Sequence, residues 1–398
     1  MKRIMFSILL LIVTLCGGHA QSSVRTILME IGQNNPRLKA AAAEMEAEKL
    51  EARSEALLAN PEVEFNYLWG AENIGGRHDL RVTQSFDIPT ITGMKGDKAS
   101  GIIELSSLKY KTECQAVLLE AQQVCIDLVY WNSVLEEQRG HLEQSVALVD
   151  SYKKRLKVGE STVLDLNKAQ IHLTSIRGQI NRAEAERRML LSSLRALNGG
   201  KEIDFDAITY DIDDTIPDNF EIWFEEASDR SPMIGYVRKQ VELENRQVAI
   251  DKASVLPELA VGYMSEIRTG EKFRGVTIGV NIPLWSAGNK VRQSKARADA
   301  ASERRSATEK EFYFYLQSQY TKALSMKDNS EMMRQSLLET DSRGYLFSAL
   351  SKGEISMVDY LVETDLYYET LEATLDAERD YRHAMAALNA FILPSLAI

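Results

Sequence analysis

The 398-residue sequence has few of the residues on which active-site chemistry usually depends. It contains 3 cysteines, 5 histidines and 8 prolines. Past residue 20 the histidines are isolated from one another and from cysteine in the sequence: His78, His141, His172 and His383. We find no glycine-rich phosphate loop and no nucleophile elbow. These absences argue against an enzyme, a metal site or a bound cofactor.

Basic residues and long apolar runs are also scarce. Lysine and arginine number 47 against 58 acidic residues, which gives a net charge of −11. An acidic chain is a poor partner for nucleic acid. Beyond the first 20 residues no run of 18 apolar residues occurs, so the sequence predicts no transmembrane helix.

The first 20 residues predict a secretory signal peptide. Lys2 and Arg3 precede an apolar run, and Gly18-His19-Ala20 supplies a small-x-small cleavage site. Lipidation at Cys16 is the alternative, which we disfavour because the preceding Leu15 is not small. A secreted chain without a helical anchor is either soluble in the periplasm or a β-barrel in an outer membrane.

The two remaining cysteines, Cys114 and Cys125, lie eleven residues apart on one predicted helix. At 1.5 Å per residue their separation is about 16 Å, too far for a disulfide. We expect both to be small buried side chains.

Helix-forming residues dominate four long stretches, at 94–157, 162–197, 290–350 and 355–392. Within the first, apolar residues from Val117 to Val149 repeat at alternating spacings of four and three. A helix this long, about 95 Å, has to pack lengthwise against other helices. A short helix is also expected at 220–229.

Four short segments alternate between apolar and polar residues, as strands do: about 62–70, 78–88, 258–266 and 274–282. Their lengths are close to those of tilted strands that cross a bilayer. A half-buried sheet in a soluble domain would alternate in the same way. Aromatic residues such as Tyr67 and Trp69 favour the membrane interpretation.

The chain is an internal duplication. Pro36, Pro61 and Pro89 recur as Pro232, Pro257 and Pro283, at offsets of 194 to 196. The expected organisation is therefore a signal peptide at 1–20, a first repeat at 21–198, a linker at 199–219, a second repeat at 220–392 and a short tail at 393–398. Four strands are too few to close a barrel, so the duplication predicts an oligomer.

The second duplicated element is a helical hairpin tip, at about 158–162 and again at about 351–356. Gly159 and Gly353 are expected to end one helix in the left-handed conformation. Thr162 with Asp165, and Ser356 with Asp359, match the capping-box pattern that begins the next helix. The alternative is a ring of carboxylates around a channel mouth, with Glu160 and Glu354 beside these two aspartates.

The paired, in-register set of these elements resembles the TolC-like outer-membrane efflux proteins. The resemblance rests on the tip pattern from Tyr152 to Gln170, on the Ala-Leu-Asn helix endings at 196–198 and 387–389, and on the strand-to-helix junctions at Pro89, Gly93, Pro283 and Gly288. It spans almost the whole mature chain.

The resemblance implies a mainly α fold with a small transmembrane β part. Three chains would form a 12-stranded β-barrel joined to a 12-helix α-barrel tunnel. The chain would lie in the outer membrane of a Gram-negative bacterium, with its tunnel in the periplasm. Its partners would be outer-membrane lipid, two further copies, a periplasmic adaptor protein and an inner-membrane pump.

The expected function is a passive exit duct of a tripartite efflux pump. By resemblance, the tips around Gly159, Glu160 and Asp165, and around Gly353, Glu354 and Asp359, would touch the adaptor and line the aperture. Two alternatives remain: a duct for type I protein secretion, or a periplasmic coiled-coil scaffold. The cargo stays open between drugs, metal ions and polypeptides.

Overall fold

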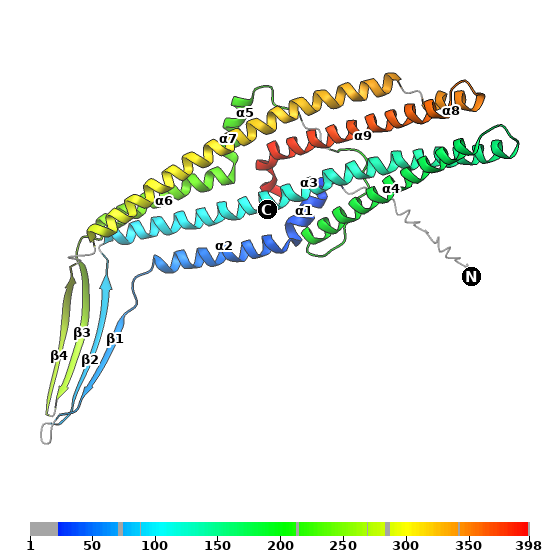
Figure 1. Cartoon of the computed structure of the whole chain (residues 1–398). Coiled ribbons are helices and arrows are strands. Elements are labelled where there is room, and N and C mark those ends of the chain that lie inside the picture. Colours follow the sequence, from blue (N-terminus) through cyan, green and yellow to red (C-terminus); the bar gives the residue numbers. More distant parts are fainter. Residues whose placement is uncertain are drawn as a thin grey trace, which may run out of the picture.

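The computed structural model describes residues 23–70, 75–87, 89–211, 215–268, 270–282, 287–340 and 343–396. The predicted signal peptide with Cys16, and Pro283, lie outside these ranges. The described chain is elongated and mainly helical (Figure 1). A four-stranded sheet stands at one end, and two helical tips lie at the opposite end.

Both halves of the chain contain two helices, two strands and then long helices in the same order, with α8 and η1 additional in the second half, so the predicted duplication is confirmed. The first half consists of α1 (Val24–Asn34), α2 (Pro36–Glu55), β1 (Glu62–Leu68), β2 (Arg77–Phe86), α3 (Pro89–Lys157) and α4 (Val163–Leu197). The second half consists of α5 (Phe220–Arg230), α6 (Pro232–Ala253), β3 (Glu258–Arg268), β4 (Glu271–Asn281), α7 (Ala287–Thr340), α8 (Arg343–Lys352), α9 (Met357–Leu388) and the 3₁₀ helix η1 (Asn389–Leu396).

The two halves also begin their strand-preceding helices in the same way. Asn35 caps α2 through its side-chain oxygen, which accepts from the amides of Arg37 and Leu38. Ser231 caps α6 by accepting from the amide of Ile234. In each case a proline follows as the first helical residue, where its missing N–H costs nothing. The recurring Asn-Pro and Ser-Pro pairs are therefore helix starts.

The long helix α3 is the spine of the molecule. Its 69 residues correspond to about 100 Å. It packs against α2 and α6 toward the sheet, against α4 toward the tips, and also against α9 and η1. Within the predicted second long helix, at 290–350, the structure describes α7 and α8, and residues 341 and 342 lie outside the described ranges.

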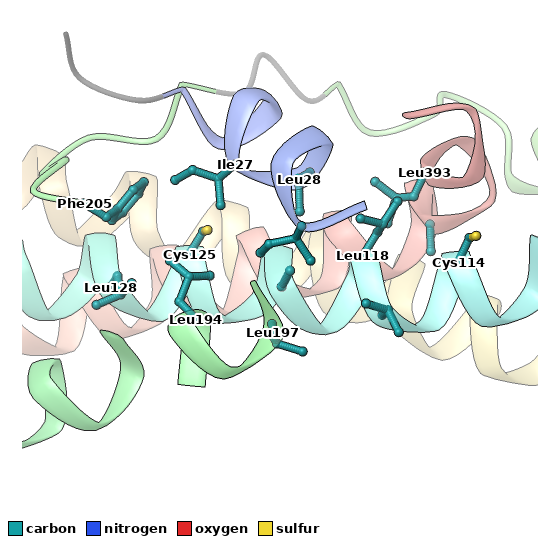
Figure 2. Close-up of a cluster of buried hydrophobic side chains, with 14 of the residues drawn as sticks. Ile27, Leu28, Cys114, Leu118, Cys125, Leu128, Leu194, Leu197, Phe205 and Leu393 are labelled. Carbon is teal, nitrogen blue, oxygen red and sulfur yellow. The ribbon is translucent and has the colours of Figure 1, made fainter. Parts of the chain in front are cut away.

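The main hydrophobic core lies near the middle of α3, where α1, α4 and η1 meet it (Figure 2). Leu118 and both cysteines are fully buried there, and the cysteines are not bonded to each other. The prediction of two small buried cysteines is therefore confirmed. Phe205 from the predicted linker and Leu393 from the predicted tail belong to the same cluster.

Hydrogen bonds hold part of the predicted linker along the helices. Asn132 Nδ2 donates to the carbonyl of Ala207 at 2.9 Å, and Ser133 Oγ donates to the carbonyl of Ile208 at 2.8 Å. Arg187 on α4 donates to the carbonyl of Phe205 at 3.2 Å. The described part of the linker before residue 212 is thus held in a fixed position across α3 and α4.

The four strands form one antiparallel sheet in the order β1-β2-β3-β4. The central pair, β2 with β3, joins the two repeats side by side. The second hairpin is longer than expected because Arg268 pairs with Glu271 next to Gly270, which has a φ of +84°. In the part of the chain that the structure describes, no helix combines the length and apolar composition needed to cross a membrane.

Candidate functional site

The sheet presents one apolar face along its whole width. Val63 pairs with Val82, Val82 with Tyr263, and Tyr263 with Val276, so these four side chains form one row. Val63 and Val276 are 68% and 74% exposed, and the helices lie beyond the end of the sheet (Figure 1). A sheet in a soluble domain would bury such a face against another layer. In the described residues of the single chain, this apolar face of the sheet stays exposed.

The opposite face of the sheet is polar, and near the hairpin loops its charges are paired. Arg81 contacts Glu64 at 3.1 Å across β1 and β2. Arg77 contacts Asp79 at 2.9 Å and Glu266 at 3.2 Å. Along β2 the basic Arg77 and Arg81 therefore flank the acidic Asp79, and Glu266 of β3 lies opposite Asp79.

Small residues occupy the same face nearer the helices, on β3 and β4. Gly262 sits between Thr83 on β2 and Thr277 on β4. A Cβ at Gly262 would lie 2.6 Å from the carbonyl oxygen of Val82, closer than real Cβ atoms come. Glycine is therefore required there by the close approach of the neighbouring backbone.

The two tips have the same backbone geometry, as their sequences predict. Gly159 and Gly353 have φ values of +79° and +78°. The next amide, that of Glu160 or Glu354, donates back to the helix it leaves, at 2.9 Å to Arg155 and at 2.8 Å to Ala349. Both tips thus end their first helix in a Schellman motif.

Both predicted capping boxes are present. The amide of Asp165 donates to Thr162 Oγ1 at 3.2 Å, while the Asp165 carboxylate accepts from the Thr162 amide at 3.2 Å and from its hydroxyl at 2.7 Å. Ser356 and Asp359 repeat this arrangement. The hydroxyl bond, then the amide bond, lowers the pKa of each aspartate.

The capping role of the aspartates is therefore confirmed, and it engages the carboxylates that the alternative would place at a channel mouth.

We expect Thr162→Val to destabilise the first tip by about 1 kcal/mol, because the hydroxyl cap is lost. Hydrogen exchange of the first turn of α4 measures this change. Ser161→Ala is the matched control, since its hydroxyl bonds only to the Thr162 carbonyl; equal acceleration in both variants would contradict the cap assignment.

Exposed apolar residues surround the first tip, and sequence reasoning missed them. Val158, Val163 and Leu164 are all exposed, Leu164 by 70%. In the sequence they are indistinguishable from residues of the buried stripe of a long helix. Only the turn at Gly159 shows that they face away from the neighbouring helix.

The structure also brings together two histidines that the sequence separates by 31 residues. His141 on α3 and His172 on α4 lie with their Nε2 atoms 3.3 Å apart. Local spacing carries no signal for such a pair, because the two residues belong to different helices. Among the described residues, no cluster of three or more histidine, cysteine, aspartate or glutamate side chains is arranged to hold a metal ion.

The predicted strand-to-helix junction is clear in the first repeat. Pro89 is the first residue of α3, and Lys95 in the next turn forms an ion pair with Asp87. Gly93 is the fifth residue of α3, and Gly288 is the second residue of α7. Both helices therefore begin before the glycine that the sequence pattern placed at the junction.

No family model matches the sequence, and no curated protein matches it. Solved structures do match the fold. CusC, studied for transmembrane channel formation, is 13% identical with a TM-score of 0.80, covering 94% of this chain and 92% of its own. The CmeC outer membrane channel of Campylobacter jejuni is 17% identical with a TM-score of 0.72, covering 93% and 85%. The open MtrE outer membrane channel of Neisseria gonorrhoeae is 12% identical with a TM-score of 0.76, covering 94% and 89%. Over nearly its whole described length, the chain has the TolC-like fold of outer-membrane channels.

Proposed function

We propose that this chain is the outer-membrane exit duct of a tripartite efflux pump. The observation that carries the proposal is the bare amphipathic sheet at one end of a helical body about 100 Å long. An apolar face fits lipid, and a polar face fits a water-filled lumen. The duct contributes no chemistry; cargo moves through it passively.

The working form is a homotrimer. In the single chain β1 and β4 are the edges of the sheet, and their outer backbone groups have no strand partner in the described residues. Such edges are not stable in lipid unless another strand covers them. Three copies joined edge to edge supply 12 strands, and their long helices supply the tunnel wall.

The tips are the docking surface for a periplasmic adaptor, which links the duct to an inner-membrane pump. Three features support this role: both tips lie at the end opposite the sheet, both are capped rigidly, and the first carries exposed Val158, Val163 and Leu164. Exposed apolar side chains next to polar groups are typical of protein contacts. Glu160, Glu354, Asp165 and Asp359 would stand around the aperture.

The periplasmic scaffold alternative is disfavoured by the sheet. A scaffold shares the long packed helices, but it has no use for a row of exposed apolar residues across four strands. A type I secretion duct would have the same architecture, so that alternative concerns only the cargo and the pump.

Planar-bilayer conductance of the purified full-length protein tests the duct. We expect stable unitary currents, and outer-membrane fractionation that requires detergent for release. Absence of currents together with recovery as free periplasmic protein would refute the proposal.

The double variant Asp165→Asn, Asp359→Asn tests the role of the tip carboxylates separately. If these groups line the aperture, we expect a lower preference for cations, because two negative charges per chain are removed. An unchanged current and ion preference would leave these residues with capping alone.

A further inference from the structure

A pair of histidines interrupts the apolar contact between the α3–α4 hairpin and α9. His141 and His172 are both buried. On the tip side lies an apolar cluster that includes Leu148, and on the sheet side lies another that includes Ile176. Burying two polar rings between apolar clusters costs desolvation. This position therefore calls for a physical reason beyond packing.

Helix α9 closes over the pair. The ring of Tyr368 stacks on that of His141, with centroids 3.8 Å apart and planes 9° apart. Asp365 Oδ1 lies 3.6 Å from His172 Nδ1. A cleft of about 490 Å³ opens beside these groups. The other ionisable side chains that line it are Lys168 on α4 and Glu369 and Glu372 on α9, and all three are exposed.

The hydrogen-bond pattern limits where protons can sit. The two Nε2 atoms are close enough to share one hydrogen, so one ring donates and the other accepts. His172 Nδ1 faces a carboxylate and is best occupied by its own hydrogen. The arrangement that satisfies the Nε2 pair and turns the second donor toward a carboxylate is therefore His141 Nε2–H donating to His172, with His172 Nδ1–H directed toward Asp365.

An additional proton then has one position left, His141 Nδ1. This atom is buried, and no acceptor in the described chain bonds to it. Gln138 Oε1, one helical turn away, is also buried without a donor and lines the same cleft. In the closed arrangement the two atoms do not bond to each other, so a proton on Nδ1 stays buried without an acceptor beneath Tyr368 unless the ring or the Gln138 side chain moves. Protonation thus opposes the contact that α9 makes with α3.

We propose that the His141–His172 pair is an acid-sensitive contact that holds α9 against the α3–α4 hairpin at neutral pH and releases it on proton uptake. His172 is ten residues from Thr162 and Asp365 is nine from Ser356, so the pair lies about 15 Å from both tips. Release shifts the tips relative to each other. The effect of this shift on adaptor docking and on opening of the aperture rests on the proposed function. The acid-sensitive contact between α9 and the α3–α4 hairpin does not.

The direction of the pH effect follows from the two protonation states. Burial, and then the neighbouring His172, lowers the pKa of His141 from 6.5 to about 3. Burial also lowers the pKa of His172, with Asp365 acting against it. When the rings are hydrated they bind protons below about pH 6.5, whereas in the closed pair the pKa of each ring is lower. The contact is therefore at full strength above pH 6.5 and weakens as the pH falls from 6.5 toward 3.

Distance measurements between spin labels test the proposal on the full-length purified protein. The labels are placed through Arg177→Cys on α4 and Glu363→Cys on α9, both exposed positions. Cys114 and Cys125 are fully buried and stay unlabelled. Between pH 7.5 and pH 5.0 we expect the label distances to lengthen and broaden, and to recover when neutral pH is restored. An unchanged distribution overturns the proposal.

Variants assign the response to the pair. In the double variant His141→Phe, His172→Gln, the phenyl ring keeps the stack on Tyr368 and neither side chain takes up a proton, so the pH response should disappear. A response that persists there overturns the proposal. If this double variant does not assemble, the single variants His78→Gln and His383→Gln take its place as the test. The pH response of the label distances must survive in both, and its loss in either contradicts the assignment to the His141–His172 pair. Neither readout requires the protein to conduct.

Discussion

Replacement of Gly262 by alanine is expected to destabilise the sheet by about 1–3 kcal/mol, the usual cost of forcing extra volume into a closely packed site. The added Cβ would lie 2.6 Å from the Val82 carbonyl oxygen and 2.8 Å from Thr277 Oγ1. Backbone cannot turn aside as a flexible side chain can. Strand β3 must therefore move away from β2, which weakens the pairing that joins the two repeats.

Gly275 provides a matched control on the next strand. It lies on the same face of the sheet as Gly262, and a Cβ there would meet nothing within 4 Å. Gly275→Ala should therefore be neutral or slightly stabilising, since alanine reduces the freedom of the unfolded chain. The measurement is the temperature at which the detergent-solubilised protein loses its folded gel mobility. Equal losses in the two variants would contradict the close approach at Gly262.

Leu118→Ala is expected to cost about 2–5 kcal/mol of stability, the range for truncating a large buried side chain. Leu118 is fully buried in the cluster where α1, α3, α4, the linker and η1 meet (Figure 2). The cavity should loosen the segments that have the fewest other contacts. Thermal unfolding followed by circular dichroism measures the overall loss, and limited proteolysis of the linker measures the local one.

Leu338→Ala is the control for this prediction. It removes the same atoms from α7 at a side chain that is 78% exposed in the single chain. We expect a change within about 0.5 kcal/mol, as for surface substitutions generally. If both variants lose the same stability and the linker stays protected from protease, the cluster around Leu118 is not the main core.

Local chemistry made much of the architecture predictable. The prolines that follow Asn35 and Ser231 favour helix starts, because the cap and the fixed φ act within one turn. Gly159 and Gly353 end helices for a similarly local reason. Strand alternation reports which residues share a face but not how long the pairing continues, so the second hairpin was predicted too short on both strands.

Contacts between distant segments were not predictable in the same way. The linker has the acidic, glycine-containing composition of a free connection, yet Phe205 is buried in the main core. The tail likewise contributes Leu393. Nothing in the local pattern distinguishes an apolar residue that finds a pocket from one that remains in solvent.

The sequence by itself determined the helix caps at the two tips and the faces of the strands, because these follow from interactions between residues close in sequence, and the duplication can be read from the recurring prolines and tips. Only the tertiary structure decided that β2 pairs with β3, that Gly262 has no room for a side chain, and that His141 meets His172 beneath Tyr368. These depend on how two long helical hairpins align over many turns. That alignment is set by the summed packing of the whole length and leaves no signature at any single position.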